Sequence, residues 1–165
     1  MNYENFRNRI KTGDLIAFSG GSWNSWNDIK INIVRMFTRS EYSHVAIAWV
    51  IEDRVLLLEA VSAGVRIFPL SNDLPCYWVE RPHRISKEAL RWALSKMGQE
   101  YSTWQAIKAF FGITDKGKDN KWECAEYVIT TYAFDGDYFD CKATPTQVVN
   151  MACNKWQAPI YKLEQ

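Results

Sequence analysis

One cysteine, Cys124, lies where a polar segment gives way to an apolar one, in the stretch DNKWECAEYVITTY (119–132). The polar residues favour a loop and the apolar residues have helical spacing, which places the thiol in the first turn of a helix. Unpaired N–H groups and the helix dipole favour negative charge there. They lower the pKa of a thiol from about 8.5 and can hold the oxyanion of a tetrahedral intermediate. The position suits a nucleophile; the alternative is a small buried core residue.

The chain has two histidines, and one of them begins a predicted strand. In EYSHVAIAW, His44 follows a polar turn, so its ring would project from a sheet edge where a helix can present its first turn. His83 lies in the Pro-containing stretch ERPHRIS, and we expect it to be exposed to solvent. His44 is therefore the expected base for a thiol that lies 80 residues later (124 − 44).

A carboxylate, Glu59, ends the apolar run VLLLE and is expected at the edge of the core, where it needs a partner. With Asp53 as the turn centre, His44 lies nine residues before it (53 − 44) and Glu59 six after it (59 − 53). This offset of about three residues, roughly 10 Å, requires a bulge or bend for direct contact. Glu59 would then orient the imidazole and stabilise its charged form. The alternative is a structural ion pair with Arg66 or a lysine.

Bulk composition limits the classes of function. The 165 residues predict one domain, 1–165, and the 20 Lys and Arg against 19 Asp and Glu give no electrostatic case for binding nucleic acid or an anionic membrane. The apolar runs are far shorter than a membrane span. With two histidines and no Cys-x-x-Cys pair, we expect no metal site. The N-terminal sequence has no apolar signal, so we expect a cytoplasmic protein, with export by another route left open.

Hydrophobic patterning predicts the elements that position these residues. Strands are expected at 14–18, 45–51, 55–59, 64–70 and 76–81. Helices are expected at 22–40, at 87–97 after the N-cap Ser86, at 102–112, from Cys124 onward, and at 143–152. The last of these has a capping box formed by Thr144 and Gln147, with Pro145 at the first position. Strands in the first half and helices mostly in the second predict an α+β fold with an antiparallel sheet.

Six short motifs occur in one order: TGDLIAF, YSHVAIAW, LLEAVSAGV, MGQEYS, WECAEYV and ATPTQVV. Between about 12 and 149 the chain resembles the circularly permuted NlpC/P60 superfamily of papain-like cysteine hydrolases, more narrowly its YiiX-type or YaeF-type branch. In that family the histidine strand precedes the cysteine helix, as here. The matching positions are Gly13-Asp14, Ser43-His44-Val45, Glu59, Gly98 to Tyr101, Cys124 and Thr144-Pro145.

The resemblance implies a papain-like fold, with an antiparallel sheet or half-barrel packed against helices and the nucleophile at a helix N-terminus. It assigns Cys124 as nucleophile, His44 as base and Glu59 as the third member, and it implies a covalent acyl-enzyme without a metal or organic cofactor. Cys76, Cys141 and Cys153 match no motif and are expected to be structural. Backbone N–H groups at Cys124 would form part of the oxyanion hole. Candidates for a second donor or substrate contact are Tyr42, Ser19, Ser22 and Trp23.

Three functions remain open at this stage. The first is hydrolysis of an amide bond in a peptide or a cell-wall peptide. The second is acyltransferase or esterase activity on lipid-like acyl groups, with Trp23 and Trp26 lining an acyl pocket; their alternative role is core packing. The third is an inactive domain kept for binding in a bacterial or phage interaction, which would have no need of Cys124, His44 and Glu59 together. The oligomeric state does not follow from these residues.

Overall fold

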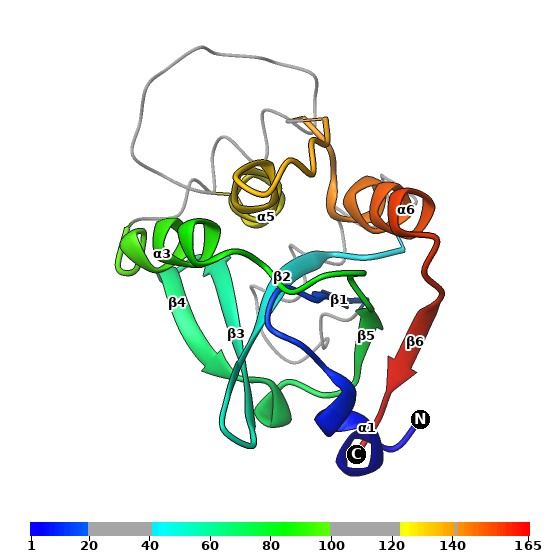
Figure 1. Ribbon diagram of the computed structural model, residues 1–165. Helices are drawn as coiled ribbons and strands as arrows, with labels where there is room; N and C mark the ends of the chain where they lie inside the picture. Colours follow the sequence, from blue (N-terminus) through cyan, green and yellow to red (C-terminus); the bar gives the residue numbers. More distant parts are fainter. Residues whose placement is uncertain (20–40, 100–122, 141) are drawn as a thin grey trace.

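The computed structural model describes residues 1–19, 41–99, 123–140 and 142–165, and these form an α+β fold (Figure 1). Six antiparallel strands pair in the order β4-β3-β2-β1-β5-β6. They are β1 (Leu15–Phe18), β2 (His44–Ile51), β3 (Arg54–Val61), β4 (Gly64–Pro69), β5 (Cys76–Val79) and β6 (Ile160–Leu163). The α-helices in the described residues are α1 (Tyr3–Phe6), α3 (Lys87–Ser95), α5 (Cys124–Ala133) and α6 (Pro145–Trp156), and the 3-10 turns are η1 (Arg7–Arg9) and η2 (Leu70–Asn72).

Every predicted strand is present, with ends that differ by at most two residues, and the helices predicted to follow Ser86, to contain Cys124 and to follow Thr144 are confirmed. Helix α1 and strand β6 were not predicted. Strand β6 pairs with β5, and a bridge between Asn2 and Glu164 brings the two chain ends together. The helices predicted at 22–40 and 102–112 lie outside the described residues.

Helices α3, α5 and α6 lie over one side of the curved sheet, and α5 lies between the other two (Figure 1). Successive side chains of a strand point to opposite faces, and this alternation divides the core into two clusters. Leu15, Val45, Ile47 and Leu58 pack with the helices, whereas Ile16, Ala46, Leu57 and Trp78 form the second cluster with residues near the N-terminus. The central strands are buried on both faces, so they provide a firm base for α5.

The start of α6 contains the predicted capping box. The Thr144 hydroxyl accepts from the Gln147 N–H, and the Gln147 side-chain oxygen accepts from the Thr144 N–H at 2.8 Å. Pro145 occupies the first helical position, where its missing N–H costs no hydrogen bond. Helix α3 begins similarly, because the Ser86 hydroxyl accepts from the Ala89 N–H at 3.1 Å.

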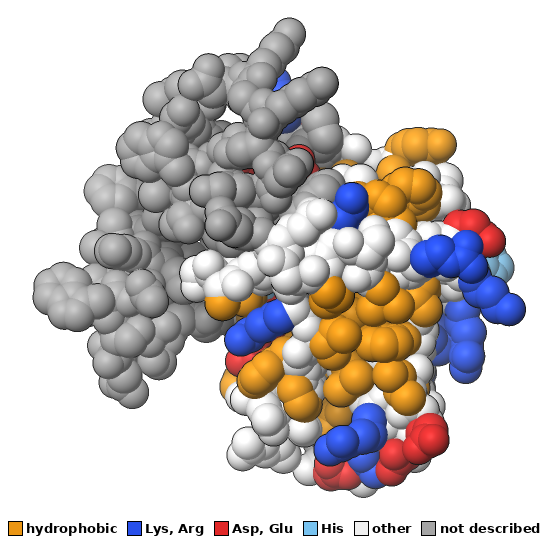
Figure 2. Space-filling model, turned by 90° about the vertical axis from the view of Figure 1, so that its left-hand side faces the viewer, with side chains coloured by type: hydrophobic (Ala, Val, Ile, Leu, Met, Phe, Trp, Pro, Cys, Tyr) orange, Lys and Arg blue, Asp and Glu red, His pale blue; other side chains and the backbone are white. Residues whose placement is uncertain are grey.

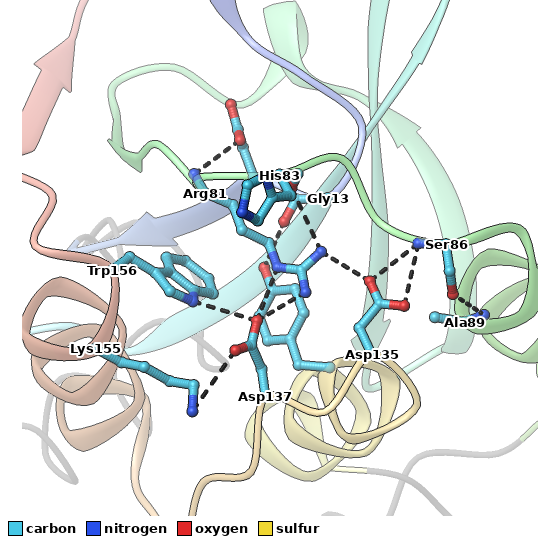
Figure 3. A network of polar contacts seen from close by, with 11 residues as sticks. Gly13, Arg81, His83, Ser86, Ala89, Asp135, Asp137, Lys155 and Trp156 are labelled. Atoms are coloured by element: carbon cyan, nitrogen blue, oxygen red, sulfur yellow. Dashed lines mark hydrogen bonds and ion pairs between the residues drawn. The ribbon is translucent and has the colours of Figure 1, made fainter.

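An ion-pair network around Arg81 fixes the C-terminal end of α5 (Figure 3). The Arg81 side chain is 6% exposed, and its guanidinium contacts Asp135 at 2.8 Å and Asp137 at 2.7 Å. Asp135 also accepts from the Ser86 N–H, and Asp137 accepts from the Trp156 indole N–H at 3.3 Å. The network therefore joins the end of α5 to the start of α3 and the end of α6. Burial would raise the pKa of Asp135, but its bonds with Ser86 and Arg81 lower it.

The Gly-Asp motif before β1 has a structural explanation. Gly13 has a φ of +104°, and a Cβ there would lie 2.8 Å from Ile85, so a side chain is excluded on both counts. Asp14 is fully buried, and its carboxylate accepts from the Trp78 indole at 2.8 Å, the Arg81 N–H at 3.0 Å and the Lys11 N–H at 2.9 Å. These bonds tie the start of β1 to β5.

Strand β4 is an edge of the sheet, and Figure 2 views the molecule from the side on which Figure 1 shows α3 and β4. Hydrophobic side chains gather on this face, and Ile67 of β4 is 41% exposed. The edge carries the charged Arg66 and ends at Pro69, two features that discourage pairing with another chain.

None of the helices in the described residues combines the length and the apolar character needed to cross a membrane.

Candidate active site

Cys124 is the first residue of α5, as predicted, and it is 7% exposed. The residue before it, Glu123, has an extended backbone, with φ −91° and ψ 152°, and its side chain makes no capping hydrogen bond. The N–H groups of Cys124 and Ala125 belong to the first turn, where no helical carbonyl precedes them. The thiol and these donors therefore lie together at the positive end of the helix dipole.

His44 is the first residue of β2, and its side chain is 21% exposed. Interaction with the nearby Cys124 side chain raises the pKa of His44, and the His44 ring stacks on Phe18 with ring centroids 5.7 Å apart. Phe18 is the residue of β1 that pairs with His44, so the pairing of β1 with β2 places the two rings beside each other. The imidazole thus lies near the thiol at the start of α5, and Phe18 is a site residue that the sequence did not reveal.

Glu59 of β3 contacts the same imidazole. Its Oε2 lies 2.7 Å from His44 Nε2, and the carboxylate is 1% exposed. Because Nε2 is engaged by Glu59, Nδ1 is the nitrogen left for the Cys124 sulfur. The sulfur, the imidazole and the carboxylate therefore form one chain of contacts that runs from α5 through β2 to β3.

The predicted offset between His44 and Glu59 is wrong. Ile51 pairs with Arg54, so the turn contains the two residues Glu52 and Asp53 and is not centred on Asp53, and Ile47 pairs with Leu58. Extending this register places Glu59 opposite Ala46, two residues from His44 and on the same face. Diagonal neighbours of this kind lie about 7–8 Å apart, within reach of long side chains, so direct contact requires no bulge.

Charges around His44 favour its protonated form. Burial alone would lower the pKa of His44, but hydrogen bonds and charge interactions with Cys124 and Glu59 outweigh it and raise the pKa from 6.5 to about 10. Burial would raise the pKa of Glu59, and the contacts with His44 and Arg66 lower it instead. Imidazolium and carboxylate are therefore the forms that the surroundings stabilise at neutral pH.

Glu59 has a second cationic partner, because Arg66 Nε donates to its Oε1 at 2.8 Å. Glu59 and Arg66 are directly opposite each other in the β3–β4 ladder. The two alternatives weighed for Glu59, a partner of His44 or an ion pair with Arg66, therefore occur together, one on each carboxylate oxygen.

Of the other predicted contact residues, two are described. Tyr42 is 3% exposed. Its hydroxyl donates to Glu41 at 3.1 Å, and its N–H donates to the Thr146 hydroxyl at 2.9 Å. Either group could donate to an oxyanion only if its present hydrogen bond breaks. Ser19 directly follows Phe18, the partner of His44, and so lies at the same end of the sheet as the site. Ser22 and Trp23 lie outside the described residues.

The other cysteines and the second histidine lie in different surroundings. Cys76 is fully buried, and burial together with the charge of Asp73 raises the pKa of its thiol to about 12. Burial also raises the pKa of Cys153. His83 is exposed, as predicted. Cys141 lies outside the described residues.

The fold is α+β and similar to that of the solved structure YiiX. Among solved structures, the chain is similar to the metalloprotein yiiX from Escherichia coli O157:H7, a DUF1105 protein, with a TM-score of 0.54 and 20% sequence identity. The match covers 76% of this chain and 66% of that one, and at this identity it shows the fold alone. No family model matches the sequence. A comparison with curated proteins likewise found no match.

That solved structure is described as a metalloprotein. In the part of this chain that the structure describes, no group of three or more His, Cys, Asp and Glu side chains is placed to hold a metal ion.

Proposed function

We propose that this protein is a thiol hydrolase of the permuted NlpC/P60, papain-like type that cleaves an amide bond in a peptide or a cell-wall peptide. The observation that carries the proposal is the chain of contacts from Cys124 to His44 to Glu59 at the start of a helix. If Cys124 were only a core residue, the nearby His44 would not need a buried carboxylate as a hydrogen-bond partner. The same arrangement is what nucleophilic catalysis by a thiol requires.

The reaction divides into two half-reactions. With the proton on His44 and negative charge on the Cys124 sulfur, the sulfur attacks the carbonyl carbon and forms a C–S bond. The N–H groups at the start of α5 stabilise the oxyanion. As the C–N bond breaks, the leaving amine takes the proton from His44, and a thioester remains. His44 then removes a proton from water, which attacks the thioester, releases the acid and restores the proton and the thiolate. Glu59 holds the imidazole and stabilises its charged form throughout.

Trapping the acyl-enzyme tests this proposal. We would incubate the protein with peptide p-nitroanilides and with p-nitrophenyl esters of short and long acyl chains, quench in acid, and locate the adduct by peptide mass spectrometry. The expected result is peptidyl transfer to Cys124, with turnover abolished by Cys124→Ala and preserved by Cys153→Ser. Hydrolysis that persists in Cys124→Ala would contradict the proposal. A long-chain acyl adduct without a peptidyl adduct would instead favour the acyltransferase or esterase alternative.

A further inference from the structure

Arg66 is joined to the candidate triad through Glu59. Its Nε donates to Glu59 Oε1 at 2.8 Å, while Glu59 Oε2 contacts His44 at 2.7 Å. The Arg66 guanidinium also lies over the Phe68 ring, 4.4 Å from its centroid. Phe68 is two residues further along β4 and therefore on the same face of the sheet, where its ring packs against the guanidinium. Arg66 is thus held between an aromatic ring and the carboxylate.

The exposures of the two partners differ sharply. The Glu59 side chain is 1% exposed, whereas that of Arg66 is 42% exposed. Solvent screens the exposed guanidinium, so this ion pair adds less to stability than a fully buried one would. The terminal torsion of a glutamate is broad and about two-fold, so one fixed oxygen determines where the other points. By holding Oε1, Arg66 directs Oε2 to the imidazole, and the imidazole in turn presents its other nitrogen to Cys124.

We propose that Arg66 is a positioning residue of this site: it fixes the Glu59 carboxylate against His44 and offsets part of the negative charge that His44 experiences. This inference rests on the proposed function. A base must release its proton as well as accept it, and catalysis is most efficient when its pKa lies near the working pH. A buried carboxylate shared with no other cation would hold the imidazolium proton more tightly. Arg66 therefore favours the second half-reaction, in which His44 must first be neutral.

Within the described residues, the charged and titratable groups that surround His44 come from four segments. They are Cys124 of α5, Glu59 of β3, Arg66 of β4, and Asp73, which follows η2. Burial and the negative charge of Glu59 raise the pKa of Asp73, while His44 and Arg66 oppose this. Removing the Arg66 charge therefore leaves both Glu59 and Asp73 with one cationic neighbour fewer. Both effects make the surroundings of His44 more negative.

The test measures the titration of His44 directly. In a His83→Asn background His44 is the only histidine, so long-range ¹H–¹⁵N correlation spectra follow its protonation without ambiguity. We expect Arg66→Met to raise the His44 midpoint by roughly half a pH unit, because the lost charge is partly screened by solvent. The matched control, Arg54→Met, removes an arginine at the far end of β3 and should leave the midpoint unchanged.

Turnover of the peptide substrate provides the second measurement. Arg66→Met should slow deacylation several-fold while the acylation burst persists. Arg66→Lys keeps the charge but not the planar guanidinium, so its His44 midpoint should match the parent while turnover still falls. If Arg66→Met does not fold, Arg66→Gln removes the charge in its place. An unchanged midpoint in Arg66→Met, or parental turnover in Arg66→Lys, overturns the inference. If the parent shows no reaction at Cys124, the proposed function fails, whatever the NMR midpoints show.

Discussion

The contact between Glu59 and His44 yields a quantitative prediction for Glu59→Gln. The substitution keeps the size of the side chain and removes its charge. Glu59 is 1% exposed, and its two oxygens accept from His44 at 2.7 Å and Arg66 at 2.8 Å. A glutamine has one acceptor oxygen and one donor NH₂ group. One of the two partners must therefore lose its acceptor, and neither keeps a charged one.

The size of the effect follows from the strength of charge-assisted hydrogen bonds. Such bonds contribute about 1.5–3 kcal/mol, against about 1 kcal/mol for neutral ones, and one pKa unit corresponds to about 1.4 kcal/mol. Losing the charge should therefore lower the pKa of His44 by roughly one unit from its value of about 10. The guanidinium is 42% exposed and can turn to water, so we expect the larger loss at His44.

The stability change should depend on pH in a defined way. The pKa of His44 is raised in the folded state from 6.5 to about 10, so its contribution is complete below about pH 6.5 and is lost as the pH rises through about 10. The pKa of Glu59 is lowered from 4.5, so its contribution is present above that value and is lost as the pH falls below it. Glu59→Gln should therefore cost most near pH 5–6.5, about 2–3 kcal/mol, and less at pH 3 or 10.

Two assays check this prediction. NMR titration in the His83→Asn background gives the His44 midpoint, and urea unfolding at pH 6 and pH 10 gives the free energy of unfolding. Glu80→Gln is the control: Glu80 pairs with Lys11 at 2.6 Å but is 37% exposed, and the loss there should stay below about 1 kcal/mol. A His44 midpoint that is the same in Glu59→Gln and in the parent would refute the reasoning, because it would mean that the Glu59 carboxylate does not stabilise the protonated imidazole.

Three further predictions concern the scaffold and the other thiols. Arg81→Met leaves two carboxylates without their buried cation and should cost about 3–5 kcal/mol in urea unfolding at pH 7. The loss should shrink as the pH falls below 3.8, because the pKa of Asp135 is lowered from that value by its contacts with Ser86 and Arg81. Thr144→Ala removes the cap of α6 and should lower the free energy of unfolding by about 1 kcal/mol, while Thr144→Ser should restore most of it. Cys153→Ser should leave turnover at its parental value; a loss greater than about twofold would place a second thiol in the reaction.

The features that the sequence predicts well are those determined by neighbouring residues. The Thr144–Gln147 box, the apolar run of strand β2 and the position of Cys124 at a helix start are all local patterns, and the structure contains each of them. Strand β6 was missed because four residues at an edge carry little periodic signal. Its pairing with β5 depends on contacts between distant parts of the chain.

Register and long-range charge pairs could not be predicted in the same way. The turn after β2 contains Glu52 with a φ of +53°, where the left-handed conformation ordinarily favours Gly or Asn. No such residue marks a two-residue turn, so the predicted offset of Glu59 was one residue too large. The contacts of Arg81 with Asp135 and Asp137 join residues 54 and 56 positions apart, and no local pattern indicates them.

Rates of alkylation at individual cysteines test the central claim, that Cys124 is a nucleophile activated by His44. The protein would be treated with iodoacetamide from pH 5 to pH 9, quenched at intervals and digested, and the modification of each of the four cysteines quantified by mass spectrometry. We predict that at pH 6 Cys124 reacts at least about tenfold faster than Cys76, Cys141 or Cys153 and that His44→Ala abolishes the difference. Equal rates and the pH profile of an ordinary thiol at all four positions would contradict the account.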